Sequence, residues 1–233
     1  MRLSGKTVFL IYLGALSIAG MVIVYLATSR MGPGVSTDSA MILSTGENLV
    51  RGQGLVDYTG TELTQFPPLY SLIMGLGSAL SGQDIFVVGW ALNIVVFGAL
   101  VWFSGLYLYD AFPSEAILAY FGSFVVMSST SLIEISSNIA SDPLFMLMVI
   151  FFLMLCAAYL RSGQISYIAF AAVLTIVASF QRYAALALVI AGALLLAYAH
   201  RAHWRRAFAR ALLFAVATAA PIFAWVLRCA DRP

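Results

Sequence analysis

The sequence predicts an all-α membrane protein that crosses the bilayer several times. Of its 233 residues, 62% are apolar and only 9% are charged, and the mean hydropathy is +0.97. Soluble domains carry about 25% charged residues, so this composition excludes a soluble core of the same length. The net charge of +2 identifies no partner. We expect membrane lipid around the chain, and no nucleic acid.

Seven apolar runs are the expected transmembrane helices. A helix needs about 20 residues to cross a hydrocarbon core of about 30 Å. None of the runs holds an ionisable residue in its interior, where a charge costs roughly 2.5–3.5 kcal/mol. Asn93 is the main polar exception, and we expect it to form a hydrogen bond between helices. The runs are 7–29, 85–109, 116–133, 143–160, 165–181, 183–199 and 209–227.

Two of these runs need comment. The first follows Arg2 and Lys6 and exceeds the ~7–15 apolar residues of a secretory signal, so we expect an uncleaved signal-anchor; cleavage after residues 27–29 is the alternative. The stretch 165–199 would measure about 50 Å as one helix, and its first half is short for a span.

An eighth apolar stretch, residues 67–82, decides which side of the membrane each loop faces. It opens with two prolines, contains three glycines, and reaches only about 24 Å as a helix. If it crossed the membrane, the arginines of 201–210 would face outside, against the positive-inside rule. We therefore expect it to lie in the outer interface or to re-enter. Residues 30–84 then form a large outer loop with short juxtamembrane helices.

This arrangement makes residues 1–233 a single multi-pass domain in the cell (inner) membrane, with a cytoplasmic N-terminus. Residues 134–142, the turn at Arg182 and the C-terminus join the 30–84 loop on the outer face. Cys156 and Cys229 give neither a disulfide framework nor a metal spacing.

Two histidines lie near the arginine cluster. His200 and His203 have helical i, i+3 spacing beside four arginines. This pattern favours a basic collar that faces lipid headgroups over a metal site. The sequence therefore predicts no metal centre and leaves any need for a divalent metal open.

The outer loop gathers half of the chain's ten carboxylates. Ser36 or Thr37 can cap a short helix that begins near Asp38, where the helix dipole favours a carboxylate. Asp38 is either part of that helix start alone or a general base exposed above the membrane. The five acids are Asp38, Glu47, Asp57, Glu62 and Asp84.

A second acid and a lone arginine are expected on the same outer face. Asp142 precedes Pro143, an arrangement that predicts a helix start capped by the aspartate. Arg182 lies between two apolar helices. It either extends to the interface as an anchor or binds an anion, because its planar fork of donors matches phosphate.

These groups suit sugar transfer from a polyprenyl-phosphate donor. The lipid phosphate is a competent leaving group, so the reaction needs chiefly a base for the acceptor hydroxyl, a contribution of typically 10²–10⁴-fold. Arg182 would stabilise charge on the departing phosphate. Tyr58, Phe66 and Tyr70 are either stacking surfaces for a sugar or interfacial anchors.

The motifs resemble the N-terminal half of the GT-C glycosyltransferases, and most closely the bacterial mannosyltransferase and aminoarabinose-transferase-like group. The similar segments are Thr37-Asp38-Ser39-Ala40, residues 48–54, Phe66-Pro67-Pro68-Leu69-Tyr70, residues 141–145, Gln181-Arg182-Tyr183, Trp225 and Arg228.

The resemblance implies an inverting hexosyl or pentosyl transferase that uses a polyprenyl-phosphate sugar and a glycan, lipid or protein acceptor. It implies that Asp38 is the base and that Asp142 completes the site, and the lipid phosphate is then the anion expected at Arg182. The expected substrate-loop residues are Glu47, Tyr58, Pro67, Pro68 and Tyr70. Ser39 and Gln65 stand where some relatives carry charge, which leaves the sugar and the acceptor open. Relatives continue into further helices and an outer domain, so we expect the conserved module without its C-terminal partner.

Two other classes of protein remain as alternatives. Ion-coupled transporters place ionisable groups inside spans or in broken helices near the midplane, whereas the spans here are free of charge. A catalytically silent assembly or interaction protein could keep the same fold. Replacement of Asp38 by Asn separates this alternative from an enzyme, and flux into proteoliposomes without any lipid-linked donor identifies a transporter.

Overall fold

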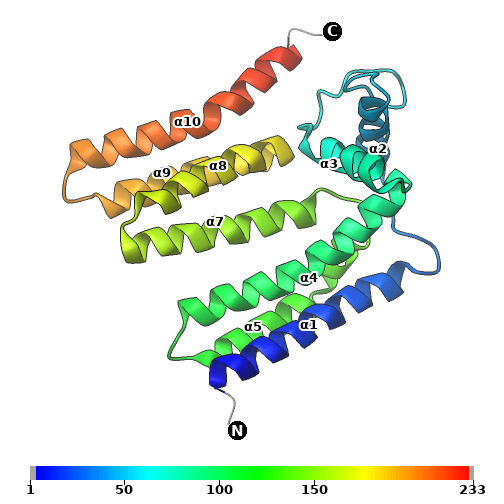
Figure 1. Cartoon of the computed structure of the whole chain (residues 1–233). Coiled ribbons are helices and arrows are strands. Elements are labelled where there is room, and N and C mark those ends of the chain that lie inside the picture. The colour runs from blue at the N-terminus through cyan, green and yellow to red at the C-terminus, as the bar shows by residue number, and fades with distance from the viewer. Residues whose placement is uncertain (1–3, 231–233) are drawn as a thin grey trace. The chain divides into compact units, whose positions relative to one another are not determined.

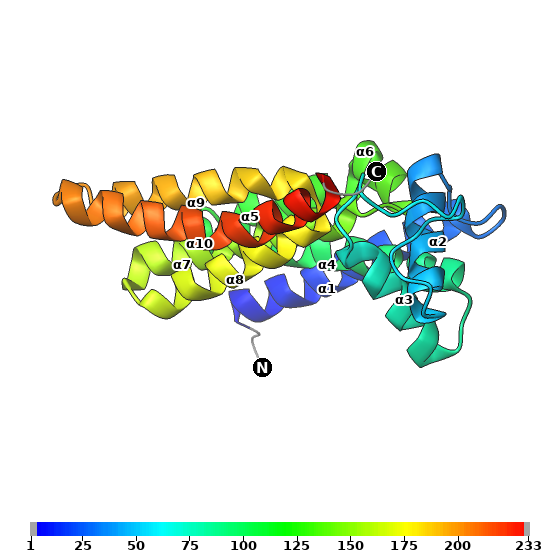
Figure 2. The ribbon, with the colours of Figure 1, turned by 90° about the horizontal axis from the view of Figure 1, so that it is seen from above.

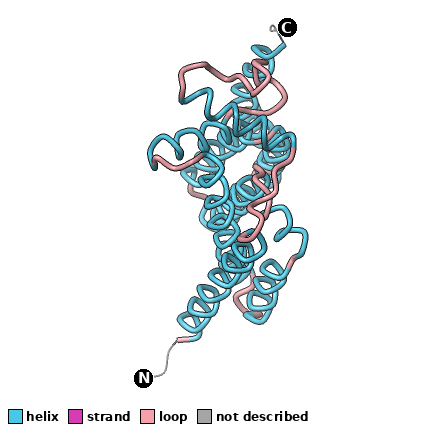
Figure 3. The backbone as a smooth tube through the Cα atoms, turned by 90° about the vertical axis from the view of Figure 1, so that its right-hand side faces the viewer, coloured by secondary structure: helices cyan, strands magenta, loops and turns pink. Residues whose placement is uncertain are grey.

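A computed structural model describes residues 4–230, and within this range the chain is helix and loop with one isolated bridge and no strand (Figure 3). The prediction of an all-α chain is confirmed. Arg2, one of the expected cytoplasmic charges, lies outside the described residues. The elements are α1 (Gly5–Thr28), α2 (Thr37–Val50), α3 (Leu69–Ser81), α4 (Ile85–Ala111), α5 (Ala116–Ser128), α6 (Thr130–Ser136), α7 (Asp142–Ser162), α8 (Ile165–Gln181), the 3-10 turn η1 (Tyr183–Ala185), α9 (Leu186–Ala199) and α10 (Trp204–Ala230).

Several of these helices can cross a membrane, as a multi-pass membrane protein requires. Among residues 4–230, α1, α4, α7 and α10 are long and apolar enough, and a fifth span results if α5 and α6, bent by 51°, count as one. The expected count of seven is not confirmed. The helical stretches 165–181 and 183–199 are shorter apolar helices, each about 26 Å long against a core of about 30 Å.

The chain forms two compact units. Among the described residues, the first comprises 4–60 and 71–150, and the second comprises 61–70 and 151–230. Helix α7 begins in the first unit and ends in the second.

In the first unit, α1, α4 and α5 lie side by side (Figure 1). Helices α1 and α4 are antiparallel: Phe9 stacks on Tyr109 with ring centroids 4.5 Å apart, and Tyr25 stacks on Trp90 at 5.6 Å. Glycines permit the close approach, since a Cβ on Gly20 would lie 2.9 Å from the Phe97 ring. Small residues commonly allow such packing between membrane helices.

The end of α1 meets the start of α4. Trp90 Nε1 donates a hydrogen bond of 2.8 Å to Thr28 Oγ1. The chain between them, residues 29–84, therefore leaves and returns at the same end of the α1–α4 pair. This segment carries α2 and α3, in agreement with the prediction of a large loop that contains short helices. Helix α3 has 13 residues, about 20 Å, too few to cross a membrane.

Helices α2 and α3 pack through backbone contact at two glycines. A Cβ on Gly75 would lie 2.5 Å from the Gly46 carbonyl oxygen, and a Cβ on Gly46 would lie 2.7 Å from the Ser71 carbonyl oxygen. No other residue fits at these two positions without a backbone shift. The pair forms the polar end of the first unit.

In the second unit, α8, α9 and α10 form two successive hairpins, and Figure 2 shows α9 and α10 side by side. At one end of this unit the Arg210 guanidinium contacts the His200 ring. At the other end Trp225 Nε1 donates to the Tyr183 hydroxyl at 3.3 Å. The arginine-rich turn and the Arg182 turn therefore lie at opposite ends of the unit.

Candidate functional site

A short parallel bridge joins the segments that lead into α2 and α7. Gly34 N donates to the Ser137 carbonyl at 2.9 Å, and Ile139 N donates to the Gly34 carbonyl at 2.9 Å. A Cβ on Gly34 would overlap the Asn138 amide oxygen, so any larger residue here requires the Asn138 side chain to move. About a hundred residues of chain separate the two segments that the bridge joins.

Asn93 of α4 holds this bridge from the helical core. Its side chain is 1% exposed, and its Nδ2 donates to the Asn138 carbonyl at 2.5 Å. The sequence analysis predicted a hydrogen bond from Asn93 to another helix. In the structure its partner lies instead in the linker between α6 and α7. Ile139 is fully buried and lies against Gly89, where a Cβ would be 3.0 Å from its methyl group. The bridge is thus fixed to α4 by one polar and one apolar contact.

Both candidate carboxylates follow directly from the bridge. Asp38 lies four residues after Gly34, and Asp142 lies four residues after Asn138. Four extended residues reach at most about 14 Å. The structure therefore joins, through one backbone bridge, the two segments that lead into the helices whose first turns carry Asp38 and Asp142.

The cap of α2 does not use Asp38. Ser39 N donates to Ser36 Oγ at 3.2 Å, and Ser36 N donates to Ser39 Oγ at 3.2 Å, which forms a reciprocal capping box. This confirms Ser36 as the predicted cap, and it gives Ser39 a role in the helix start. Asp38 lies in the first turn and is exposed, so its carboxylate faces away from the protein interior.

Helix α7 begins one residue earlier than the sequence predicts. Phe145 N donates to the Ser141 carbonyl at 3.1 Å, which places Ser141 at the cap and Asp142 at the first helical position. Asp142 is half-buried. The aspartate was expected to be the cap itself, and helix ends commonly shift by one residue in this way.

A polar cleft lies between α2, α3 and the start of α4 in the first unit. Its volume is about 380 Å³. Glu47, nine residues after Asp38 on α2, forms one wall, about 14 Å from Asp38 along the helix axis. The lining residues are Glu47, Val50, Arg51, Gly75, Ser78, Gly82, Gln83, Asp84 and Ile85.

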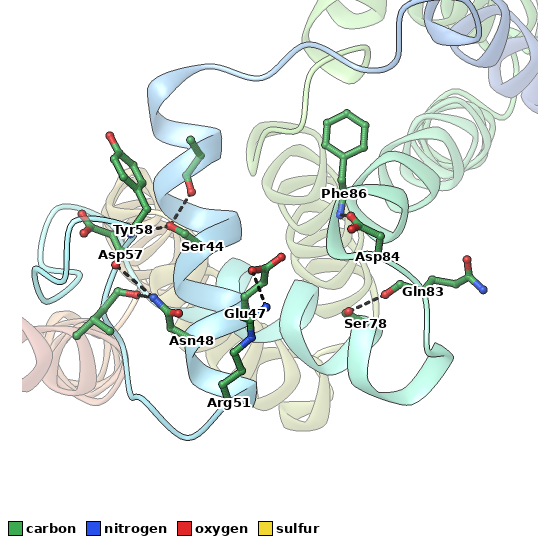
Figure 4. Close-up of polar contacts among 12 residues, drawn as sticks. Ser44, Glu47, Asn48, Arg51, Asp57, Tyr58, Ser78, Gln83, Asp84 and Phe86 are labelled. Atoms are coloured by element: carbon green, nitrogen blue, oxygen red, sulfur yellow. Dashed lines mark hydrogen bonds and ion pairs between the residues drawn. The ribbon is translucent and has the colours of Figure 1, made fainter.

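The polar side chains of the cleft are held by local bonds (Figure 4). Glu47 pairs with Arg51 at 3.5 Å, and their side chains are 42% and 66% exposed. Exposed pairs of this kind contribute about 0–1 kcal/mol, so a ligand can replace either partner at little cost. Asp84 Oδ1 accepts from Phe86 N at 2.8 Å and caps α4. Of the residues that line this cleft, the sequence analysis predicted a substrate-binding role only for Glu47. Arg51 also lines the cleft, and its i, i+4 spacing from Glu47 could have indicated the pair.

The loop after α2 is tied back to that helix. Asn48 Nδ2 donates to the carbonyls of Val56 and Asp57 at 2.9 and 3.2 Å, and Tyr58 N donates to Ser44 Oγ at 3.1 Å (Figure 4). The Tyr58 side chain is 59% exposed. Its ring is therefore available to a ligand, on a backbone that α2 holds in place.

In the second unit, three separate motifs meet at one tyrosine. The Tyr183 hydroxyl donates to the Thr64 carbonyl at 3.2 Å and accepts from Trp225 Nε1 at 3.3 Å. The segment 61–70, which contains Pro67, Pro68 and Tyr70, thereby joins the Arg182 turn and α10. Pro67 is buried and Pro68 half-buried, while Tyr70 is 1% exposed.

Arg182 terminates α8. Its backbone is extended (φ −153°, ψ 142°), its N–H donates to the Ala178 carbonyl, and its side chain is half-buried. A second arginine lies at the same end of the unit: Arg228 sits over the Trp225 ring at 5.0 Å. The sequence analysis assigned no role to Arg228. Its i, i+3 spacing from Trp225 could have predicted the contact between the two side chains.

Among residues 4–230, no three His, Cys, Asp or Glu side chains lie close enough together to hold a metal ion. The functional groups that the described sites offer to a ligand are therefore carboxylates, arginines, hydroxyls and one exposed tyrosine ring. No family model, curated protein or solved structure matches the chain.

Proposed function

We propose that this protein is a membrane glycosyltransferase of the GT-C type. It transfers a hexosyl or pentosyl group from a polyprenyl-phosphate donor to an acceptor hydroxyl at the outer face of the cell membrane. The observation that carries the proposal is the Gly34–Asn138 bridge, because it joins the helix starts of Asp38 and Asp142. The order of the motifs along the sequence gives the donor class.

The reaction is a single displacement. The acceptor oxygen attacks the anomeric carbon of the sugar, the bond from that carbon to the phosphate oxygen breaks, and polyprenyl phosphate leaves. Attack from the face opposite the leaving group inverts the anomeric configuration. The acceptor proton passes to the Asp38 carboxylate, which is exposed in the first turn of α2. A base of this kind contributes typically 10²–10⁴-fold.

Asp142 acts on the acceptor rather than on the donor. A carboxylate accepts hydrogen bonds from sugar hydroxyls, and a half-buried side chain at a helix start is held more firmly than an exposed one. Asp142 therefore orients the acceptor hydroxyl toward Asp38. The cleft beside Glu47 and Arg51 offers further donors and acceptors for the rest of a polar acceptor, and the exposed Tyr58 ring offers a stacking face.

Arg182 binds the phosphate of the donor. Its guanidinium presents paired N–H donors that match phosphate oxygens, and it keeps its charge in an apolar setting. As the bond to the sugar breaks, negative charge grows on the phosphate, and a fixed cation there lowers the barrier.

The proposed sidedness puts the N-terminus in the cytoplasm and residues 30–84 outside. The second unit supports it, because Arg201, Arg205, Arg206 and Arg210 lie at the end opposite to the Tyr183–Trp225 contact. The positive-inside rule assigns that arginine-rich end to the cytoplasm.

The test is donor turnover by the purified protein in proteoliposomes. Synthetic polyprenyl-phosphate mannose, arabinose and aminoarabinose are supplied, and release of polyprenyl phosphate is followed by mass spectrometry. Asp38→Asn is expected to lower turnover at least about 100-fold. Glu134→Gln is the matched control, since Glu134 is an exposed carboxylate of the same unit. Full turnover by Asp38→Asn, or an unchanged cellular glycan profile after deletion of the gene, would contradict the proposal.

A further inference from the structure

The arginine-rich end of the second unit holds an apolar groove that the proposed reaction does not use. Its volume is about 310 Å³, at the small end of the ~300–1,000 Å³ typical of ligand pockets. Arg210 is the single charged residue that lines it. The lining residues are Ile165, Ile168, Ala169, Ala172, Leu196, Arg210, Leu213, Phe214 and Ala217.

Two helical stripes form the walls of this groove. The lining positions of α8 and of α10 each follow the spacing i, i+3, i+4 and i+7, which places them on one face of each helix. Both helices begin at the same end of the unit, so Ile165 and Arg210 lie at the mouth, and Ala172 and Ala217 lie deepest. Seven residues of helix make the groove about 10 Å long.

The mouth of the groove is strongly basic. Arg210 contacts the His200 ring, and Arg206 lies one turn earlier on the same stripe of α10. Two other arginines rest on aromatic rings, Arg201 on Tyr198 at 4.3 Å and Arg205 on Trp204 at 5.5 Å. These cation–π contacts hold Arg201 and Arg205 at the rim, while Arg206 and Arg210 continue the line of the groove itself.

We infer that this groove binds one acyl chain of an anionic phospholipid, with the lipid phosphate held by Arg210 and Arg206. The apolar walls match a hydrocarbon chain, and the arginine pair matches a phosphate that carries net negative charge. A zwitterionic lipid would bring a cation of its own beside the arginines. The exposed Trp204 ring suits the level of lipid headgroups. A polyprenyl phosphate offers the same phosphate, and the test below separates it from a phospholipid.

The test counts bound lipids by native mass spectrometry of the purified full chain. The protein is titrated in detergent with 1-palmitoyl-2-oleoyl phosphatidylglycerol, the matching phosphatidylcholine, or undecaprenyl phosphate. The wild type is expected to retain one phosphatidylglycerol in preference to the other two. Ala172→Trp fills the deep end of the groove, and Arg210→Gln removes the phosphate ligand. Each is expected to weaken phosphatidylglycerol binding about tenfold, or about 1.4 kcal/mol.

Two control variants separate the groove from the basic surface. Val173→Trp adds the same side chain to the exposed face of α8, since Val173 is 59% exposed and does not line the groove. Arg205→Gln removes a charge from the rim. Both are expected to stay within about twofold of the wild type, as surface changes usually do. If Ala172→Trp does not yield a monodisperse protein, Ala169→Phe fills the groove from its exposed edge.

Three results would overturn the inference. Equal loss of lipid in the groove variants and in their controls would assign binding to the basic surface alone. Equal retention of phosphatidylcholine would remove the role of charge. Preferential retention of undecaprenyl phosphate would assign the groove to a polyprenyl lipid. None of these outcomes depends on turnover of a sugar donor, so the result stands apart from the proposed transferase activity.

Discussion

Gly34 lies opposite Asn138 in a parallel bridge whose two hydrogen bonds, both 2.9 Å, flank the asparagine. Each of the two residues precedes a carboxylate by four positions, Asp38 in one segment and Asp142 in the other. The bridge therefore links the segments that lead into two helices, each of which carries one of these acids in its first turn.

Replacement of Gly34 by Ala is expected to displace the Asn138 side chain from its bond to the Glu134 carbonyl and thereby weaken this bridge. The added methyl group would overlap the Asn138 amide oxygen, and overpacking of this kind costs about 1–3 kcal/mol. Turnover of the proposed donor should fall with stability, because the two helix starts separate. The midpoint of thermal unfolding in detergent measures the first effect. Gly5→Ala is the control, since a Cβ there meets nothing within 4 Å, and equal midpoints for both variants would contradict the account.

Replacement of Asn93 by Leu is expected to destabilise the first unit. Leucine has a similar size but cannot donate, so the Asn138 carbonyl loses its bond from α4. A buried polar group left without a partner costs about 1–3 kcal/mol. Asn138→Ala is the paired variant: it keeps the carbonyl and removes only the side-chain bond to the Glu134 carbonyl, so its loss should be smaller. The thermal midpoints of the two variants in detergent measure these losses, and an equal or larger loss for Asn138→Ala would contradict the role of the Asn93 bond.

The sequence predicted the long helices well because each is a run of apolar residues. Residues 85–109 were expected as a span and α4 covers Ile85–Ala111; likewise 143–160 became Asp142–Ser162. Hydropathy carries no information on where a backbone bends. The break at Ser129 was therefore missed. The break at Arg182 was predicted, but the helices on its two sides, 165–181 and 183–199, were counted as spans and are shorter apolar helices in the structure, which accounts for most of the difference between seven expected spans and the four or five that the described helices supply.

The candidate site was predictable in its residues but not in its geometry. Asp38 and Asp142 were identified from helix-start patterns, which depend on neighbours along the chain. The bridge between the segments that precede them pairs Gly34 with Asn138 and is held by Asn93, whose partner is a loop carbonyl. A glycine in a loop and an asparagine in an apolar helix each occur in many structural roles. Neither residue therefore predicts that the two segments meet in a bridge.

Replacement of Gly75 by Ala is expected to separate α2 from α3 and to distort the polar cleft. The added Cβ would lie 2.5 Å from the Gly46 carbonyl oxygen, and backbone atoms cannot move aside without shifting a whole helix. Gly77→Ala on the same helix is the control, because its Cβ would meet a methyl group of Val88 at 2.7 Å, and that side chain can rotate. The Gly75 variant should show the lower thermal midpoint. The reverse order would argue against the glycine contact.

Replacement of Arg182 by Lys is expected to weaken donor use although the charge remains. Lysine offers a compact ammonium rather than a planar fork, so a bidentate contact with phosphate is lost. We expect kcat/KM for the polyprenyl-phosphate sugar to fall about tenfold or more, and to fall further for Arg182→Gln. Steady-state turnover in proteoliposomes measures both. Equal kinetics for wild type and Arg182→Gln would leave Arg182 as an interfacial anchor only.

Sidedness provides the most direct test of the whole arrangement. Single cysteines replace residues 38, 142, 182 and 203 in a background without Cys156 and Cys229, and intact cells are labelled with a membrane-impermeant thiol reagent. Positions 38, 142 and 182 should label under the proposed sidedness. For position 182 the expectation rests on the second unit alone, where the Arg182 turn lies at the end opposite to the arginine-rich turn. Position 203, in the arginine-rich turn, should be protected until the cells are opened. If 203 labels while 142 is protected, the outer face does not hold both Asp38 and Asp142, and a mechanism that joins them fails.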